Sequence, residues 1–126
     1  MIEVKVWSLA VDEKNQFPVV ILQSLDGTKR LPIWIGPPEA SAIAMEIAGK
    51  KFQRPLTHDL LVSILNGMGA KVRRVEITDL RENTFYAKVY LEANGELLAV
   101  DSRPSDSLAV ALKTKARIFV APHLFS

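Results

Sequence analysis

The sequence predicts an α+β protein built as a single domain, residues 1–126, with a mixed, strongly curved sheet and about three helices. Three observations predict this class. Short segments with alternating or continuous apolar residues are typical of strands. Three longer segments repeat their apolar residues at helical spacing. The pairs Asp26-Gly27 and Asn94-Gly95 are typical of tight hairpin turns between strands.

The elements follow in chain order. We expect strands at 2–11, 17–25, 31–35, 71–80, 84–92, 96–100 and 118–120, and helices at 37–48, 57–68 and 104–115. The continuous apolar run Val19–Leu22 predicts a strand buried on both faces. Arg73-Arg74 interrupts the alternation of its strand and suggests a bulge. From residue 122 onward the chain is expected to be a tail.

The helix ends carry clear signals. Gly36 and Pro37 are suited to begin the first helix, and Gly49 is suited to end it. Thr57 is the expected N-cap of the second helix. An apolar stripe along that second helix is expected to be buried. Its members are Leu60, Leu61, Ile64, Leu65 and Met68.

The two halves of the chain resemble one another weakly. Each half reads strand, strand, turn with Gly, strand, and then a helix opened by proline. Aligning Pro37 with Pro104 places Glu39 opposite Asp106. A duplicated β-β-β-α unit would produce a mixed sheet that could close like a barrel, with the helices packed on it. Coincidence between two amphipathic helices is the alternative.

Composition excludes several classes of protein. The chain has no cysteine, which removes disulfides, thiolate metal sites and cysteine nucleophiles and is compatible with the cytoplasm, where we expect the protein. No apolar run approaches the roughly 20 residues of a membrane span, so no membrane partner is expected. The net charge of +2 permits nucleic-acid binding without requiring it. Sequence motifs of nucleotide-binding folds, zincins and serine hydrolases are absent.

Polar residues gather at the three predicted helix starts. They are Glu39, Arg54, Thr57, His58, Asp59, Asp101, Arg103, Ser105 and Asp106. A helix N-terminus offers free N–H groups that suit anions such as phosphate. Arginine binds phosphate through two parallel hydrogen bonds, carboxylates bind divalent metal ions, and histidine moves protons near neutral pH. The alternative is that these residues are ordinary helix caps and first-turn acids, with arginines that only stabilise the fold by pairing with them.

Three motifs carry a family resemblance: LPIWIGPPEASAIA, RPLTHDLL and DSRPSDSLAVAL. In their order and spacing, over roughly Val4 to Val120, they resemble the bifunctional nuclease (BFN) domain family. The resemblance implies a compact α+β domain with nuclease activity on DNA and RNA. The residues that match the family motifs are Ile35, Gly36, Glu39, Ala40, Arg54, Pro55, Thr57, His58, Asp59, Asp101, Arg103, Pro104, Ser105 and Asp106.

The first hypothesis is therefore a nuclease that hydrolyses phosphodiester bonds of DNA or RNA. His58, Asp59 and Asp106 would be catalytic. Phosphate would be bound by Arg54, Thr57, Arg103 and Ser105. Mg²⁺ or Mn²⁺ would be held by Glu39, Asp59, Asp101 and Asp106.

Two rival hypotheses remain. The chain could be a non-catalytic binding or assembly module, in which the Arg and acidic motifs form a structural network, or a module that binds a small phosphorylated ligand. Because small domains with curved sheets often pair through a sheet edge, a homodimer is expected.

Overall fold

The computed structural model describes residues 1–125. Seven strands form one open sheet in the order β3-β2-β1-β7-β4-β5-β6. The strands are β1 Ile2–Val11, β2 Pro18–Ser24, β3 Arg30–Trp34, β4 Lys71–Arg81, β5 Thr84–Ala93, β6 Glu96–Ser102 and β7 Arg117–Val120. The helices are α1 Pro37–Ala48, α2 Thr57–Gly67, α3 Pro104–Thr114 and the 3₁₀ helix η1 Pro122–Phe125. The predicted α+β class, mixed sheet and single domain are confirmed.

The sheet joins the two halves of the chain through its last strand. The antiparallel β1-β2-β3 and β4-β5-β6 units lie on either side of β7. β7 is antiparallel to β1 and parallel to β4, which makes the sheet mixed. The barrel-like closure considered above does not occur, because β3 and β6 are both edges. Each half runs β-β-β-α, the element order that a duplication predicts.

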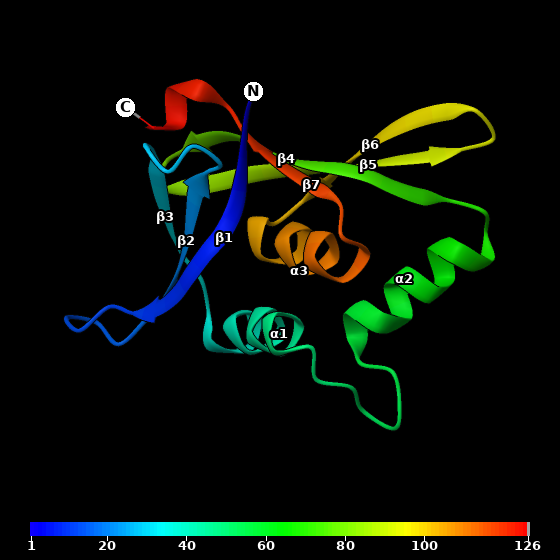
Figure 1. Ribbon diagram of the computed structural model, residues 1–126, viewed down its shortest axis with the longest axis horizontal. Coiled ribbons are helices and arrows are strands. Elements are labelled where there is room, and N and C mark those ends of the chain that lie inside the picture. Colours follow the sequence, from blue (N-terminus) through cyan, green and yellow to red (C-terminus); the bar gives the residue numbers. More distant parts are fainter. Residues whose placement is uncertain (126) are drawn as a thin grey trace.

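The three α-helices lie together on one side of the sheet, with α3 closest to it (Figure 1). α3 packs against β4, β5 and β7, and α1 and α2 pack against α3. α3 is the most buried helix, and Leu108 is fully enclosed. Val20 and Leu22 of β2, with Ile77 of β4, complete the centre of the core. α3 therefore fixes where the ends of α1 and α2 can lie.

Several local predictions are confirmed. Gly36 is the N-cap of α1, and Gly49 ends that helix in the left-handed conformation with φ 66°. β2 is buried on both faces. The register of β4 shifts between Val72 and Arg74, where the double arginine predicted a bulge.

Other local predictions are wrong. The N-cap of α2 is Leu56 rather than Thr57, because the Asp59 carboxylate accepts the Leu56 N–H at 2.8 Å. The apolar stripe of α2 is not buried, and that helix has no buried residue. The expected tail contains η1, whose Leu124 and Phe125 pack against the core. None of the helices within residues 1–125 has the length and apolarity that a membrane span requires.

Candidate functional site

A cleft of about 600 Å³ lies between α1 and α2, and the first turn of α3 forms part of its wall. The link from residue 49 to 56 also contributes residues to its lining. The polar and aromatic side chains that line the cleft are Glu39, Ser41, Glu46, Lys50, Phe52, Thr57, His58, Asp59, Arg103 and Asp106. Three helices and one link therefore meet at a single concave surface.

The start of α3 is held firmly at this wall. Arg103 is the N-cap, and its backbone carbonyl accepts the Ser107 N–H at 3.1 Å and the Ser102 hydroxyl at 2.8 Å. The buried Ser107 hydroxyl donates to the Pro104 carbonyl at 2.8 Å. Proline suits the first helical position because its fixed φ is already helical and it has no N–H to leave unpaired. The side chains of Arg103 and Asp106 therefore project from a backbone that these hydrogen bonds hold in place.

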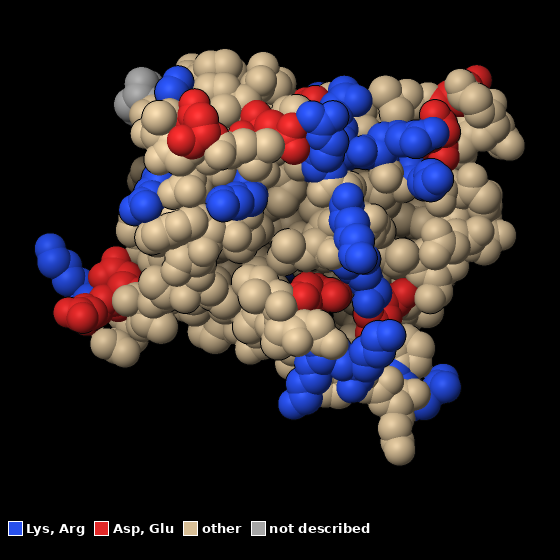
Figure 2. All heavy atoms as spheres, viewed as in Figure 1, with Lys and Arg blue, Asp and Glu red and all other residues tan. Residues whose placement is uncertain are grey.

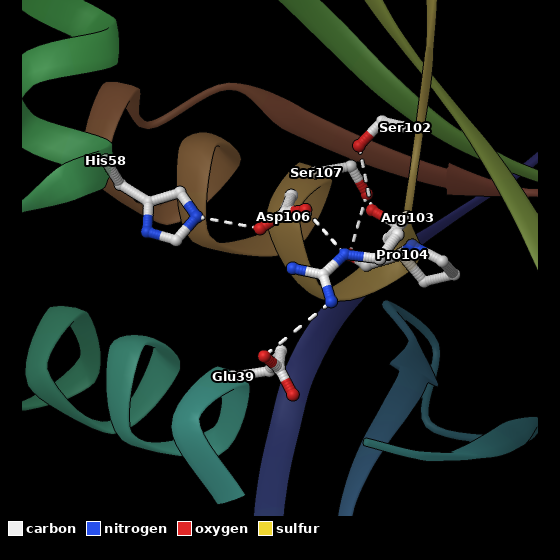
Figure 3. Close-up of polar contacts among 7 residues, drawn as sticks. All are labelled: Glu39, His58, Ser102, Arg103, Pro104, Asp106 and Ser107. Carbon is white, nitrogen blue, oxygen red and sulfur yellow. Dashed lines mark hydrogen bonds and ion pairs between the residues drawn. The ribbon is translucent and has the colours of Figure 1, made fainter. Parts of the chain in front are cut away.

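A chain of charged groups crosses the cleft wall (Figure 3). Arg103 Nε donates to Asp106 Oδ2 at 2.8 Å, and Arg103 Nη1 lies 3.6 Å from Glu39 Oε2. His58 Nε2 lies 3.0 Å from Asp106 Oδ1. An ionised carboxylate can only accept hydrogen bonds, so Nε2 carries the hydrogen. In the neutral form of the ring the lone pair is then on Nδ1, which Figure 3 shows on the side away from Asp106.

The environment of Asp106 favours its ionised form. Burial raises the pKa of this carboxyl, but the hydrogen bonds from Arg103 and then His58 outweigh burial and hold the pKa below its ordinary value. The Asp106 side chain is 35% exposed and the His58 side chain 20% exposed. The ionised Asp106 carboxylate next to the half-buried imidazole orients the ring through its contact with Nε2.

A second ion-pair group joins all three helices through Glu46 and Asp59, which line the cleft, and Lys113, which lies outside the lining. Lys113 of α3 forms a close ion pair with Asp59 of α2, and its Nζ lies 3.5 Å from Glu46 Oε2 of α1. The pKa of Asp59 is lowered, first by the hydrogen bond from Lys113 and then by the Leu56 N–H. The same hydrogen bond raises the pKa of Lys113. These pairs set the distance between the walls of the cleft.

Comparison with known sequences identifies the family. A family model described as the bifunctional nuclease domain matches residues 20–126. The chain belongs to the bifunctional nuclease domain family. The resemblance noted in the sequence is thereby confirmed.

Relatives of this BFN domain occur in bacteria and plants. An uncharacterized protein of Mycobacterium tuberculosis is 42% identical over 118 residues, which cover 94% of this chain and 70% of that protein. Bifunctional nuclease 1 of Arabidopsis thaliana is 27% identical over 111 residues, covering 85% of this chain and 34% of the relative. Bifunctional nuclease 1 of Oryza sativa subsp. japonica is 27% identical over 105 residues, covering 80% of this chain and 32% of the relative. This BFN domain thus spans about a third of the plant nucleases.

The structure brings together six of the nine residues that the sequence singled out. Those in the cleft lining are Glu39, Thr57, His58, Asp59, Arg103 and Asp106. The other three lie elsewhere. Ser105 is only 6% exposed and lines a separate hollow beside β3. Asp101 belongs to β6, opposite Lys88 of β5. Arg54 is exposed in the link and makes none of the ion pairs found among residues 1–125.

The four carboxylates expected to hold Mg²⁺ or Mn²⁺ are not gathered around one point. Among residues 1–125, no three His, Asp or Glu side chains are placed to hold one metal ion. Glu39 and Asp106 share Arg103, Asp59 is paired with Lys113, and Asp101 lies outside the cleft lining. As arranged, these carboxylates fit cationic side chains rather than a divalent metal ion.

Sequence reasoning missed Glu46, Lys50 and Phe52 as parts of the cleft lining, and Lys113 as the ion-pair partner of Asp59 and Glu46. A signal for Lys113 was present, because it follows Asp106 by two helical turns and so lies on the same face of α3. Glu46 follows Glu39 by the same interval on α1. The two link residues offered no such periodicity, because their position depends on how the link folds back over the cleft.

The ion pairs of Asp106 predict a pH-dependent contribution to stability. We expect Asp106→Asn to lower the free energy of unfolding at pH 7 by about 1 kcal/mol, a value reduced for the partial exposure of the side chain. Because the folded pKa is depressed, the contribution is present above the unfolded pKa of about 3.9 and is lost as the pH falls through the folded value. Urea unfolding of the wild type and of Asp106→Asn, at pH 7 and at pH 3, measures the difference in the free energy of unfolding at each pH.

Asp101→Asn is the control for this experiment, since Asp101 forms none of the ion pairs found among residues 1–125. It should change stability little at either pH. A difference between wild type and Asp106→Asn that is the same at pH 7 and pH 3 would show that the charge of Asp106 does not stabilise the fold.

Proposed function

We propose that this domain hydrolyses phosphodiester bonds of RNA or DNA in the cleft between α1 and α2. The observation that carries this proposal is the His58 imidazole, hydrogen-bonded at Nε2 to the Asp106 carboxylate inside the cleft. Membership of the BFN family and the names of the plant relatives support the same reaction class.

His58 has the chemistry of a general base. Its Nδ1 would accept the proton of an attacking water while the water oxygen forms a bond to phosphorus. The bond from phosphorus to the leaving nucleotide oxygen breaks, and that oxygen takes a proton from solvent. Asp106 stabilises the imidazolium that results, since its carboxylate stays ionised beside the ring. Arg103 and Thr57 are proposed to contact the phosphate from the same wall.

The aromatic and apolar part of the cleft suits a nucleobase. Phe52 lines the cleft and is 41% exposed, and Lys50 Nζ lies 5.5 Å from the centre of its ring. Bases stack on exposed aromatic rings, and cationic side chains add to such contacts. A nucleotide could therefore place its base against Phe52 and its phosphate toward His58.

Positive charge borders this part of the cleft. Lys50, Lys51 and Arg54 all belong to the link between α1 and α2. Figure 2 shows Lys and Arg side chains gathered at the lower edge of the molecule, where Figure 1 places this link. The carboxylates of the cleft are already paired with Arg103 and Lys113, so their repulsion of a phosphate is reduced. The link is therefore the proposed path of the nucleic-acid backbone.

We expect replacement of Lys50, Lys51 and Arg54 by alanine to weaken nucleic-acid binding. Each lost phosphate contact should reduce the slope of log affinity against log salt by about 0.7–0.9. Fluorescence anisotropy with a labelled single-stranded oligonucleotide, measured from 50 to 200 mM salt, tests this expectation.

The matched control removes three lysines from the first half of the chain, outside the cleft lining: Lys5, Lys14 and Lys29. It changes the net charge equally. Equal weakening by both triple variants would mean that total charge, rather than the link, governs binding.

The test of the activity itself is cleavage of single-stranded RNA, single-stranded DNA and duplex DNA by the purified chain. The reactions contain Mg²⁺, Mn²⁺ or a chelator, because the paired carboxylates do not form a metal centre among the described residues. Cleavage that is lost in Asp59→Asn/Asp106→Asn, with the fold retained, supports the proposal. No cleavage of any substrate by well-folded wild type overturns it.

One observation favours a second candidate, a non-catalytic binding module. Arg103 forms ion pairs with both Glu39 and Asp106, as expected of an arginine whose role is structural. Arg54 does not fit that picture, because it is exposed and lies outside the ion pairs of residues 1–125. A thermal-shift screen with nucleotides and inorganic phosphate, in the absence of cleavage, would identify the ligand of such a module.

A further inference from the structure

A smaller hollow, of about 270 Å³, lies next to the cleft and beside the end of β3. The end of β3, the first residues of β5 and the first turn of α3 form its walls. Figure 1 shows the turn between β4 and β5 reaching the side of the molecule where β3 lies. Pockets for whole drug-sized ligands usually measure about 300–1,000 Å³, so this space suits one ring-sized group. We name it the β3 hollow.

The floor of the β3 hollow is apolar. Ile33 and Ile35 belong to the core, and Pro104 is buried at the start of α3. Phe85 is half-buried and packs against the same core. Small-molecule sites are typically lined by apolar and aromatic side chains, with a few polar groups that fix the orientation of the ligand. The floor therefore suits the flat apolar face of an aromatic ring such as a nucleobase.

Three polar side chains of this lining have no hydrogen-bond partner within residues 1–125: Asn83, Thr84 and Ser105. Ser105 is only 6% exposed, and every fully enclosed polar side-chain atom of residues 1–125 has a partner, so the Ser105 hydroxyl must reach a surface. The surface that Ser105 lines is the β3 hollow. Buried polar groups are usually hydrogen-bonded, so this hydroxyl indicates a ligand that supplies the bond. Hydroxyl and amide groups both donate and accept, as the edge of a base and the hydroxyls of a sugar require.

An ion pair separates the β3 hollow from the cleft. Arg103 and Glu39 line both spaces, and Arg103 Nη1 lies 3.6 Å from Glu39 Oε2. Figure 3 shows this pair between His58, which lines the cleft, and Pro104, which lines the hollow. Among the described residues, Arg103 and Glu39 are the only charged side chains in the lining of the hollow, so their charges cancel there. A neutral group therefore fits the hollow better than a phosphate does, whereas a phosphate between the two spaces would lie next to Arg103.

We propose that the β3 hollow binds a nucleoside, which a phosphate at Arg103 joins to the nucleotide in the cleft. The base lies on the apolar floor, and Asn83, Thr84 and Ser105 form hydrogen bonds with its edge or its sugar. The inference rests on the proposed function and narrows it, because the substrate becomes a chain of at least two linked nucleotides. It also gives a role to Ser105, which the sequence predicted to bind phosphate and the structure places outside the cleft lining.

The first test is an NMR titration of the ¹⁵N-labelled chain with phosphorothioate dinucleotides of the four bases, whose linkage resists hydrolysis, and with the matching 5′-mononucleotides. We expect a dinucleotide to shift the backbone amide signals of Thr84 and Ser105, in the hollow, together with those of Lys50 and Phe52, in the cleft. Mononucleotides should bind at least about 10-fold more weakly, because each fills one subsite at a time.

The pattern of shifts separates this inference from the proposed function. Shifts confined to Lys50 and Phe52 would overturn the inference and leave the proposed nuclease cleft standing. Shifts confined to Thr84 and Ser105 would overturn the linked subsites and count against the cleft as well. Mononucleotides that bind the hollow as tightly as dinucleotides would show a site for a free nucleotide, which also overturns the inference.

The second test uses two hairpin turns of the same sheet. Asn83 has φ 64° in the turn between β4 and β5, a conformation that glycine adopts freely, so Asn83→Gly should fold normally. We expect it to weaken dinucleotide binding by about 3–10-fold, the usual effect of one lost hydrogen bond, and Thr84→Val to do the same. Asn94→Gly is the matched control, since Asn94 has φ 52° in the turn between β5 and β6 and lies outside the linings of the cleft and the hollow. Unchanged binding in both hollow variants, or an equal loss in Asn94→Gly, overturns the inference.

Discussion

Replacing His58 with alanine is expected to lower the rate of nucleic-acid cleavage by about 10²–10⁴-fold, the usual contribution of a positioned general base. The physical reason is that His58 Nδ1 is the proposed proton acceptor, and Asp106 holds the ring through Nε2. Because the His58 side chain is 20% exposed and its pair with Asp106 is at the wall of a cleft, the fold should survive the change. Cleavage of a labelled RNA under single-turnover conditions measures the rate.

The chain supplies a matched control, because it has only two histidines. His123 lies in η1, outside the lining of the cleft, so His123→Ala should cleave at the wild-type rate. Circular dichroism of both variants checks the fold. A folded His58→Ala variant that cleaves as fast as wild type would remove His58 from the reaction and point to a contaminating nuclease or to other residues.

The second large effect concerns stability. Leu108→Ala is expected to lower the free energy of unfolding by about 2–5 kcal/mol, because it leaves a cavity where a fully buried side chain stood. Leu108 lies in α3, the helix that packs on the sheet, carries Asp106 into the cleft and pairs its Lys113 with Asp59. Natural domains have only about 5–15 kcal/mol of stability, so the loss is a large fraction of the total. Chemical denaturation and a fall in melting temperature of about 10 °C would show it.

Ile47→Ala on α1 serves as its control. Ile47 is 54% exposed, so the same kind of truncation should change stability by less than about 0.5 kcal/mol. Equal losses in the two variants would contradict the central position of α3. A loss of cleavage in a still-folded Leu108→Ala variant would further indicate that the site depends on how α3 packs against the sheet.

The local elements of this protein were predictable from its sequence. Every main strand and helix occurs within a few residues of its expected place, because apolar periodicity is a local property of the chain. The ends of α1 follow from Gly36, Pro37 and Gly49, whose backbone preferences act without tertiary contacts. Part of the site was also predictable, since Glu39, His58 and the other first-turn residues that line the cleft belong to helix starts.

Other features depend on distant parts of the chain and could not be read from local patterns. The sequence predicts β7 only as a short last strand. In the structure it joins the two halves of the sheet, because it pairs with both β1 and β4 and buries Ile118 and Val120 in the core. Arg54 and Arg103 look alike in sequence, each before a proline. Among residues 1–125, only Arg103 of the two is paired with carboxylates, because α1 and α3 bring Glu39 and Asp106 to it.

The sequence by itself determined the class of fold, the elements and the helix starts at which the polar residues gather, because these follow from the periodicity and backbone preferences of neighbouring residues. Only the tertiary structure decided which charges are paired and which apolar residues stay exposed. It placed Asp106 between Arg103 and His58, and it left Leu60 and Ile64 on the open side of α2. Charge pairing and burial depend on the distances between elements, and packing around α3 sets those distances.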